Sequence, residues 1–141
     1  MKRKIFVDSD VVLSSLISSK GAAYFLLNKV DLNLFISNIS IQELERGVNK
    51  LDLDKDQLTN LVRKRLKTVK FIKKSNKIKK DFRDYVFDED DAHIVAGARK
   101  AKAKLILSYN IKDFNTSKLK EDFNIAVQTP AQFLQYLRSQ N

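Results

Sequence analysis

The chain has 141 residues, of which 43% are hydrophobic and 31% are charged, so it is long enough for one domain with a buried core, and wholesale disorder is excluded. It contains no cysteine and one histidine. This excludes disulfides, thiolate nucleophiles and metal sites that need thiolates or two imidazoles. Any bound metal must therefore be held by oxygen, which favours Mg²⁺ or Mn²⁺ over zinc.

The net charge of +10 is concentrated in one part of the chain. Residues 46–83 contain 14 Lys/Arg and 4 Asp/Glu, whereas the remaining residues hold equal numbers of both signs. Such a segment favours an anionic partner, of which nucleic acid is the commonest. A lysine-rich, solvated surface explains the same charge equally well.

The first residues have the basic-then-apolar order of a signal peptide. Asp8 and Asp10 interrupt the apolar run, and no small-residue cleavage site follows. No stretch approaches the length of a membrane span. We therefore expect a soluble, cytoplasmic protein that does not enter a membrane.

The first third of the chain alternates short apolar strands with helices. The expected elements are a strand, two helices and a second strand, at residues 4–7, 10–18, 21–30 and 33–37. Ser40 and Glu43 then match the S-x-x-E capping box, which predicts that a helix begins at Ser40.

The middle of the chain is basic and mostly helical in pattern. From residues 52–56 onward, apolar residues recur on one helical face and cations on the other, and residues 68–72 could form a short strand. Ile78 and Phe82 indicate a further helix. We expect a basic helical insertion at about residues 46–83 within a single domain that spans residues 1–141.

The last third returns to alternating elements. A helix with acids before it and cations at its end covers residues 92–103. Strands are expected at 104–108 and 125–127, and Thr129-Pro130 begins a final helix. This order predicts an α/β domain with a central parallel sheet of four or five strands flanked by helices.

Acidic residues fall where strands end and helices begin. Asp8 ends the first strand, Glu43 opens the helix after the second, and Asp91 opens the helix that leads into the third. Asn110 and Asp113 follow that third strand. Ligands of open parallel sheets bind beyond the carboxyl ends of the strands, and hard divalent cations need several converging carboxylates. The pattern therefore indicates a cation site.

Each acid also has a structural interpretation. Glu43 is the expected acid of its capping box, Asp91 could cap a helix, and Asp113 could belong to a turn. Asp8 is harder to explain in this way, because an acid that ends a buried strand is costly unless it is paired. His93, inside an apolar helix, is interpreted as a core histidine.

Four motifs in this order resemble the PIN-domain family, in particular the small VapC-like toxins of toxin–antitoxin systems. They are FVDSDVVLSSLIS at 6–18, SNISIQELERGV at 37–48, DEDDAHIVAGARKAKAKLILS at 88–108 and NIKDF at 110–114. The resemblance implies a Mg²⁺- or Mn²⁺-dependent endoribonuclease that acts on RNA, pairs with a cognate antitoxin and forms a homodimer.

The same resemblance implies site residues. It assigns catalysis and metal binding to an acidic cluster made of Asp8, Glu43, Asp91 and Asp113. Three further residues are expected to support the site. Asp10 stands where Asn is common, Asn110 stands where a fourth Asp is frequent, and Ser108 takes the place of a usual hydroxyl residue.

In this scheme Asp8 anchors the metal and Glu43 holds or deprotonates the attacking water. The basic segment binds the RNA backbone without reading its bases. The cations expected to contact RNA are Arg46, Arg63, Lys64 and Lys67.

Two other functions stay open at this stage. Residues 8–12, DSDVV, also fit the D-x-D-x-[TV] opening of haloacid-dehalogenase-type phosphatases, with Asp8 as nucleophile. That scheme makes Asp10 indispensable and Glu43 dispensable, and the nuclease scheme says the reverse. The chain could also be a non-catalytic basic RNA-binding module whose acids only cap helices.

Overall fold

Five parallel strands form one central sheet in the computed structural model, which describes residues 3–72 and 75–140. The spatial order is β3-β2-β1-β4-β5, so the first strand lies in the middle of the sheet. The strands are β1 (Lys4–Val7), β2 (Asn33–Ser37), β3 (Leu66–Val69), β4 (Leu105–Leu107) and β5 (Ala126–Gln128). The predicted α/β class and parallel sheet are confirmed.

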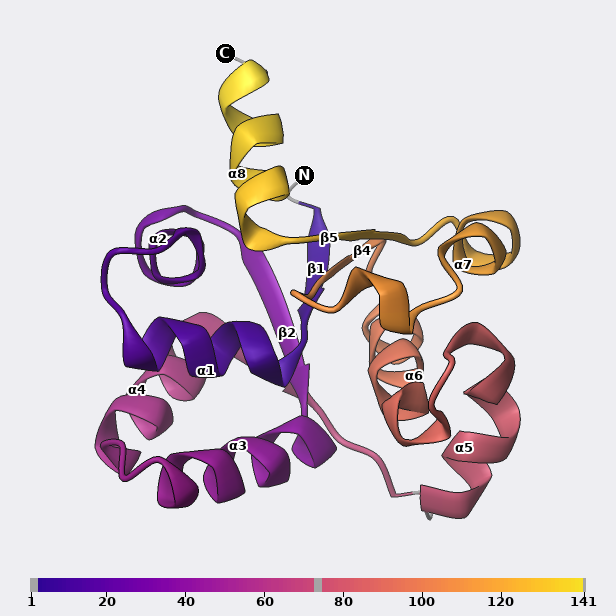
Figure 1. The fold of residues 1–141 in the computed structure, drawn as a ribbon, viewed down its shortest axis with the longest axis horizontal. Helices are drawn as coiled ribbons and strands as arrows, with labels where there is room; N and C mark the ends of the chain where they lie inside the picture. The colour runs from indigo at the N-terminus through magenta and orange to yellow at the C-terminus, as the bar shows by residue number, and fades with distance from the viewer. Residues whose placement is uncertain (1–2, 73–74, 141) are drawn as a thin grey trace.

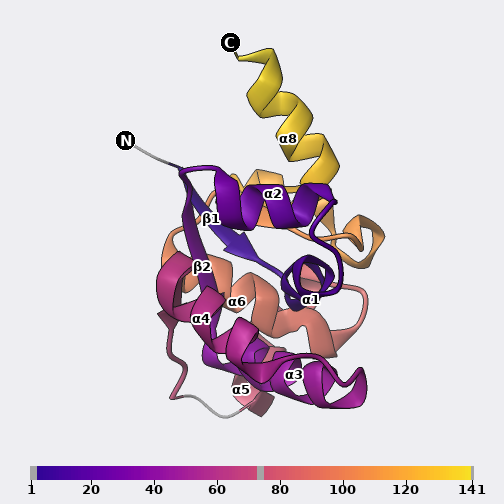
Figure 2. The same ribbon diagram turned by 90° about the vertical axis from the view of Figure 1, so that its left-hand side faces the viewer.

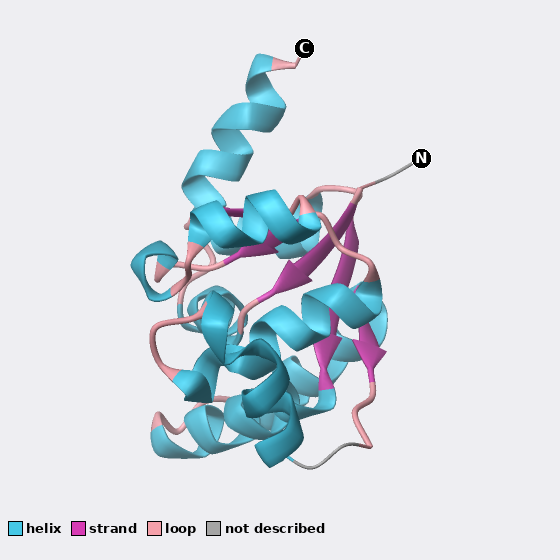
Figure 3. Cartoon of the chain, turned by 90° about the vertical axis from the view of Figure 1, so that its right-hand side faces the viewer, coloured by secondary structure: helices cyan, strands magenta, loops and turns pink. Residues whose placement is uncertain are grey.

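Helices cover both faces of this sheet (Figure 1). One face carries α1 (Ser9–Ile17), α2 (Ala22–Lys29), α3 (Asn38–Lys50) and α4 (Lys55–Arg65), which face the viewer in Figure 2. The other carries α5 (Ser75–Phe82), α6 (Ala92–Ala101) and α7 (Thr116–Phe123). The last helix, α8 (Pro130–Ser139), packs on α2 and projects from the molecule (Figure 3). Three short 3₁₀ helices are η1 (Arg83–Tyr85), η2 (Glu89–Asp91) and η3 (Ile111–Asp113).

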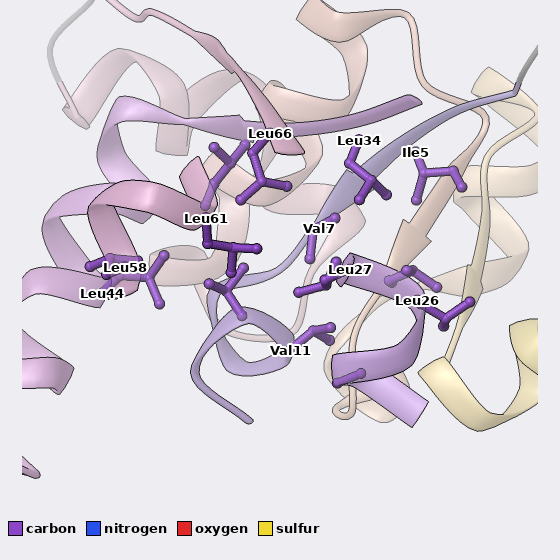
Figure 4. Close-up of a cluster of buried hydrophobic side chains, with 14 of the residues drawn as sticks. Ile5, Val7, Val11, Leu26, Leu27, Leu34, Leu44, Leu58, Leu61 and Leu66 are labelled. Carbon is purple, nitrogen blue, oxygen red and sulfur yellow. The ribbon is translucent and has the colours of Figure 1, made fainter. Parts of the chain in front are cut away.

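The alternation of side chains along the strands divides the interior into two apolar layers. Ile5 and Val7 of β1 belong to the layer under α1–α4, whereas Phe6 belongs to the layer under α5–α7. Successive strand residues point to opposite faces, so a strand buried on both sides is apolar throughout. Figure 4 shows the first layer, in which Val7 and Leu34 lie among side chains of α1, α2 and α4.

A glycine lets α6 approach the sheet closely. A Cβ atom placed on Gly97 would lie 2.3 Å from Cζ of Phe6, a side chain that is completely buried. Only a residue without a side chain fits there. The contact fixes α6 directly on β1, and therefore fixes the start of α6 relative to the end of β1.

Some expected boundaries differ from the structure. The capping-box prediction is wrong: α3 begins at Asn38, and the Ser37 hydroxyl caps it by accepting a bond from the Ser40 amide at 3.0 Å. The strand expected at 68–72 lies at Leu66–Val69, at the edge of the sheet. The basic segment therefore supplies a strand as well as helices, and its residues 73 and 74 lie outside the described ranges.

The final helix begins as expected. The Thr129 hydroxyl accepts a bond from the Gln132 amide at 3.1 Å, and the Gln132 side-chain oxygen accepts one from the Thr129 amide at 3.0 Å. Pro130 occupies the first turn. Across the described residues, no single helix has the length and apolar character needed to cross a membrane; α1 and α2 meet that test only as a pair bent by 97°.

Candidate active site

A small polar cavity of about 160 Å³ lies where the carboxyl ends of the central strands meet helix N-termini. Its lining consists of Asp8, Ser9, Asp10, Glu43, Asp91, Ile94, Asn110, Asp113 and Phe114. It thus contains five carboxylates from four separate segments, and none of the lysines and arginines of the described chain. All four acids of the expected cluster line this one cavity.

Asp8 is the most buried of these acids, with 7% of its surface exposed. It directly follows β1 and precedes α1, yet within the described chain its side chain does not cap that helix. Its Oδ2 accepts a bond from the Ser108 hydroxyl at 2.8 Å, and Ser108 in turn accepts one from the Asn110 amide at 3.1 Å. Burial, and then the nearby charge of Asp10, raise the pKa of Asp8 to about 7.

Asp10 lies in the first turn of α1 and is tied to the loop after β4. Its Oδ2 accepts bonds from the Tyr109 amide at 3.1 Å and from Nδ2 of Asn110 at 3.0 Å. Its Oδ1 is buried and has no hydrogen-bond partner among the described residues. Burial raises the pKa of Asp10, and the nearby backbone amides of Tyr109 and Val11 oppose that rise.

Glu43 reaches the cavity from the second turn of α3. Its Oε1 accepts a bond from the Ser9 hydroxyl at 3.3 Å, and its Oε2 lies 3.2 Å from Nε2 of His93. His93 is buried, and its Nδ1 has no partner in the described chain. An ionised Glu43 carboxylate can only accept hydrogen bonds, so Nε2 of His93 must be the donor in this contact. A proton on Nδ1 would be buried without an acceptor, which is costly, so a neutral His93 ring carries its proton on Nε2.

Sequence reasoning did not connect His93 with Glu43. The two residues come from different helices on opposite faces of the sheet, and no local pattern links positions 43 and 93. The prediction of a buried histidine is confirmed, but this histidine also contacts the acidic cluster. Only the position of α6 against the sheet brings the two side chains together.

Asp91 and Asp113 complete the lining from the α6 side. Asp91 ends η2 and precedes α6, and within the described chain its side chain makes no capping bond. Burial, and then the charges of Asp8 and Asp113, raise the pKa of Asp91 to about 6. The Asp113 carbonyl accepts a bond from the Phe87 amide at 3.0 Å, which ties η3 to the segment before Asp91.

The expected RNA-binding cations lie in two places. Arg46 is exposed on α3, one turn after Glu43. Arg63, Lys64 and Lys67 line a separate cleft at the amino ends of β1, β2 and β3, the edge of the sheet opposite to the cavity. The structure therefore does not bring these three side chains to the acidic cluster.

The donor chemistry fits a hard divalent cation, but the spacing is not that of a formed site. Within residues 3–72 and 75–140, no group of three or more histidine, aspartate or glutamate side chains is arranged to hold a metal ion. Burial first, and then repulsion between neighbouring carboxylates, raise the pKa values of Asp8 and Asp91. Among the described residues, Oδ1 of Asp10 has no partner and no lysine or arginine lines the cavity, so a bound cation would compensate the negative charge.

A family model described as PIN domain matches residues 4–112. The chain belongs to the PIN domain family. The match includes β1–β4 and all of the acidic residues at the cavity except Asp113, which lies one residue beyond it. A search of curated proteins found no match.

Solved structures confirm the PIN fold. A toxin–antitoxin complex from Klebsiella pneumoniae superposes with a TM-score of 0.62 at 20% identity, covering 89% of this chain and 97% of that one. VapBC2 from Rickettsia felis, solved with a DNA fragment from its promoter, gives 0.59 at 19% identity and covers 89% and 98%. Mycobacterium tuberculosis VapC20, a toxin that cleaves the sarcin–ricin loop, gives 0.55 at 14% identity and covers 86% and 98%. These PIN structures share the present fold along nearly their whole lengths.

Proposed function

We propose that this PIN domain is a metal-dependent endoribonuclease that hydrolyses RNA phosphodiester bonds and acts as the toxin of a toxin–antitoxin pair. The observation that carries the proposal is the cavity at the carboxyl ends of the strands, which gathers five carboxylates and no basic side chain of the described residues. Such a cavity would repel a phosphodiester unless a cation reversed its sign.

The size of the cavity supports a substrate that presents one phosphate group of a nucleic-acid backbone. At about 160 Å³ it is smaller than the roughly 300–1,000 Å³ clefts that enclose small-molecule ligands. It has room for an ion and a few waters, at about 30 Å³ each, but not for a nucleotide. A phosphate group presented by a longer strand would lie at its mouth.

The side chains divide into two roles. Asp8, Asp91 and Asp113 would hold Mg²⁺ or Mn²⁺, which supplies positive charge to the phosphate and lowers the pKa of a water. Glu43 would accept the proton of the attacking water. The bonds from Ser9 and His93 fix the Glu43 carboxylate in place for this role.

The competing functions receive less support. Capping does not account for the acids, because within the described chain neither Asp8 nor Asp91 caps its helix by a side-chain bond, and Glu43 is not at the start of α3. A phosphatase that used Asp8 as nucleophile would not need Glu43, yet Glu43 lines the same cavity and is held there by Ser9 and His93.

The comparisons support an antitoxin partner. Similar folds were solved as toxin–antitoxin complexes from Klebsiella pneumoniae and Rickettsia felis. We propose that this protein also pairs with a cognate antitoxin, acts as a homodimer, and works in the cytoplasm.

The proposal is tested by exchanging one carboxylate for an amide. Glu43→Gln should lower the rate of RNA cleavage by about 10²–10⁴-fold, since it removes the proposed general base. The measurement is single-turnover cleavage of a labelled RNA in Mg²⁺ or Mn²⁺, with a matched reaction in EDTA that should show no cleavage.

Glu45→Gln is the matched control, because Glu45 is exposed on the same helix and lies outside the cavity lining. It should cleave like the wild type. Expression in a bacterial host should arrest growth for the wild type and for Glu45→Gln, but not for Glu43→Gln. Cleavage by Glu43→Gln at the wild-type rate, or full cleavage in EDTA, would show that the proposal is wrong.

A further inference from the structure

The two oxygens of the Asp10 carboxylate have different surroundings. Oδ2 accepts two bonds, from the Tyr109 amide and from Nδ2 of Asn110. Oδ1 is buried and has no partner among the described residues, and Asp10 is one of the residues that line the cavity. A buried carboxylate oxygen without a donor costs free energy, so the fold alone gives no account of this arrangement.

The groups around Asp10 do not supply the missing charge. Asp8, Asp91 and Asp113 share the cavity with it, and none of the described lysines and arginines lines that cavity. The first turn of α1 gives some stabilisation through the helix dipole, which is small compared with the burial of a charge. An acid in this position is stabilised most by a cation that occupies the cavity.

The loop after β4 holds Asp10 in one orientation. Nδ2 and the backbone amide of Asn110 are both engaged, with Asp10 and with Ser108. The Tyr109 hydroxyl lies 3.2 Å from the Ser14 hydroxyl, a second link between this loop and α1. These contacts hold Oδ2 and leave Oδ1 as the carboxylate oxygen without a hydrogen bond among the described residues.

We propose that Asp10 is a direct ligand of the catalytic cation through Oδ1, and that Asn110 is the residue that positions it through Oδ2. The proposal rests on the function proposed above and adds a fifth carboxylate to its site. It also reverses the expectation that a nuclease of this type can do without Asp10.

The experiment measures Mn²⁺ binding to the full-length protein by calorimetry, so that it does not depend on turnover. Asp10→Asn should weaken Mn²⁺ binding by at least about tenfold, as expected for the loss of one charged ligand. Its melting temperature in EDTA should be higher than that of the wild type, because an uncompensated carboxylate is removed. A residue with only a structural role would shift the melting temperature in the opposite direction.

The exchange variant Asp10→Asn with Asn110→Asp tests the pairing. This variant keeps one amide and one carboxylate hydrogen-bonded to each other at positions 10 and 110, but it moves the negative charge to the loop after β4. It should therefore recover part of the Mn²⁺ affinity that Asp10→Asn loses. Asp56→Asn is the matched control, because Asp56 is also an acid in the first turn of a helix and lies outside the cavity. It should bind Mn²⁺ like the wild type.

The outcomes separate the two proposals. Wild-type affinity in Asp10→Asn together with loss of binding in Asp8→Asn would overturn the role of Asp10 and leave the proposed function standing. Failure of the wild type itself to bind Mn²⁺ would overturn both. A folded exchange variant without any recovery would overturn the positioning role of Asn110.

Discussion

Asp8 follows three completely buried residues of β1 and is itself poorly solvated. Water is largely excluded from its carboxylate, and Asp10 adds a second negative charge nearby, so the pKa of Asp8 rises to about 7. The Ser108 hydroxyl offsets part of this effect by donating to Oδ2. The fold therefore holds an acid whose charged form is costly at neutral pH unless a cation is present.

This cost has a measurable pH dependence. The pKa of Asp8 is higher in the folded state than its value of 3.8 in an unfolded chain. The folded state thus binds the proton more tightly than the unfolded chain does. The stability that this proton contributes is fully present below about pH 4 and is lost as the pH rises to about 7. In EDTA, Asp8→Asn should become more stable than the wild type as pH increases from 5 to 8, by roughly 1–3 kcal/mol at pH 8.

Chemical denaturation at several pH values measures this difference. Asp122→Asn is an informative control, because the hydrogen bonds from Tyr85 and Lys118 lower the pKa of that exposed acid. Its loss should destabilise the protein at neutral pH, the opposite sign to Asp8→Asn. A stability difference between Asp8→Asn and the wild type that does not change with pH would contradict the account of Asp8.

At the scale of the elements, two glycines in helices have opposite roles. Gly97 faces the Phe6 ring, and a Cβ atom there would overlap Cζ at 2.3 Å. Gly47 of α3 faces only Leu13, whose nearest atoms would lie at an ordinary 3.5 Å. Gly97→Ala should therefore destabilise the protein by about 1–3 kcal/mol through overpacking. Gly47→Ala should be neutral or stabilise it by up to about 1 kcal/mol.

The same pair of variants links packing to activity. Gly97→Ala pushes α6 away from β1, and α6 carries His93 and follows Asp91, so cleavage should fall even at temperatures where the variant is fully folded. Gly47→Ala should retain activity. Thermal melting and cleavage assays on both variants provide the measurement, and equal stability of the two would refute the packing account.

The order and type of the elements could be predicted from local patterns, but some of their boundaries could not. Apolar runs such as residues 4–7 and 104–108 identify strands because both faces of the sheet are covered. The start of α3 was missed because Ser37 caps it from the last position of β2, and the S-x-x-E match at Ser40 was fortuitous. The acids at the cavity follow from the rule for parallel sheets. The contact of His93 with Glu43 depends on tertiary packing and has no local signal.

At the scale of the whole molecule, the charges are separated. The acidic cavity lies at the carboxyl ends of the strands, and Arg63, Lys64 and Lys67 line a cleft at their amino ends. The two edges are separated by about one strand length, roughly 13–17 Å. A long RNA bound at the cavity can cover both edges, and the distant cations would then contribute affinity without taking part in cleavage.

We therefore expect the triple variant Arg63→Ala, Lys64→Ala and Lys67→Ala to bind long RNA more weakly while keeping its rate of single-turnover cleavage at saturation. The slope of log affinity against log salt should decrease by about 2, at roughly 0.7 per phosphate contact with a single strand. Binding of a labelled RNA at several salt concentrations measures this slope.

A second triple variant controls for net charge. Lys20→Ala, Lys29→Ala and Lys120→Ala remove the same charge from scattered exposed positions, and should change the slope much less. Equal slopes for the two triple variants would mean that total charge, and not this cleft, attracts the RNA.

The residues that line the cavity come from two parts of the chain, one before β3 and one after it. Asp8, Asp10 and Glu43 precede β3, whereas Asp91, Asn110 and Asp113 follow it, and β1 meets β4 in the middle of the sheet. A protein divided between β3 and α5 would thus carry three of the five acidic residues on one piece and two on the other. Under the proposed function, neither piece alone would cut RNA, and activity would return only when the two joined along β1 and β4. A harmful nuclease of this fold could thus be made conditional by splitting it.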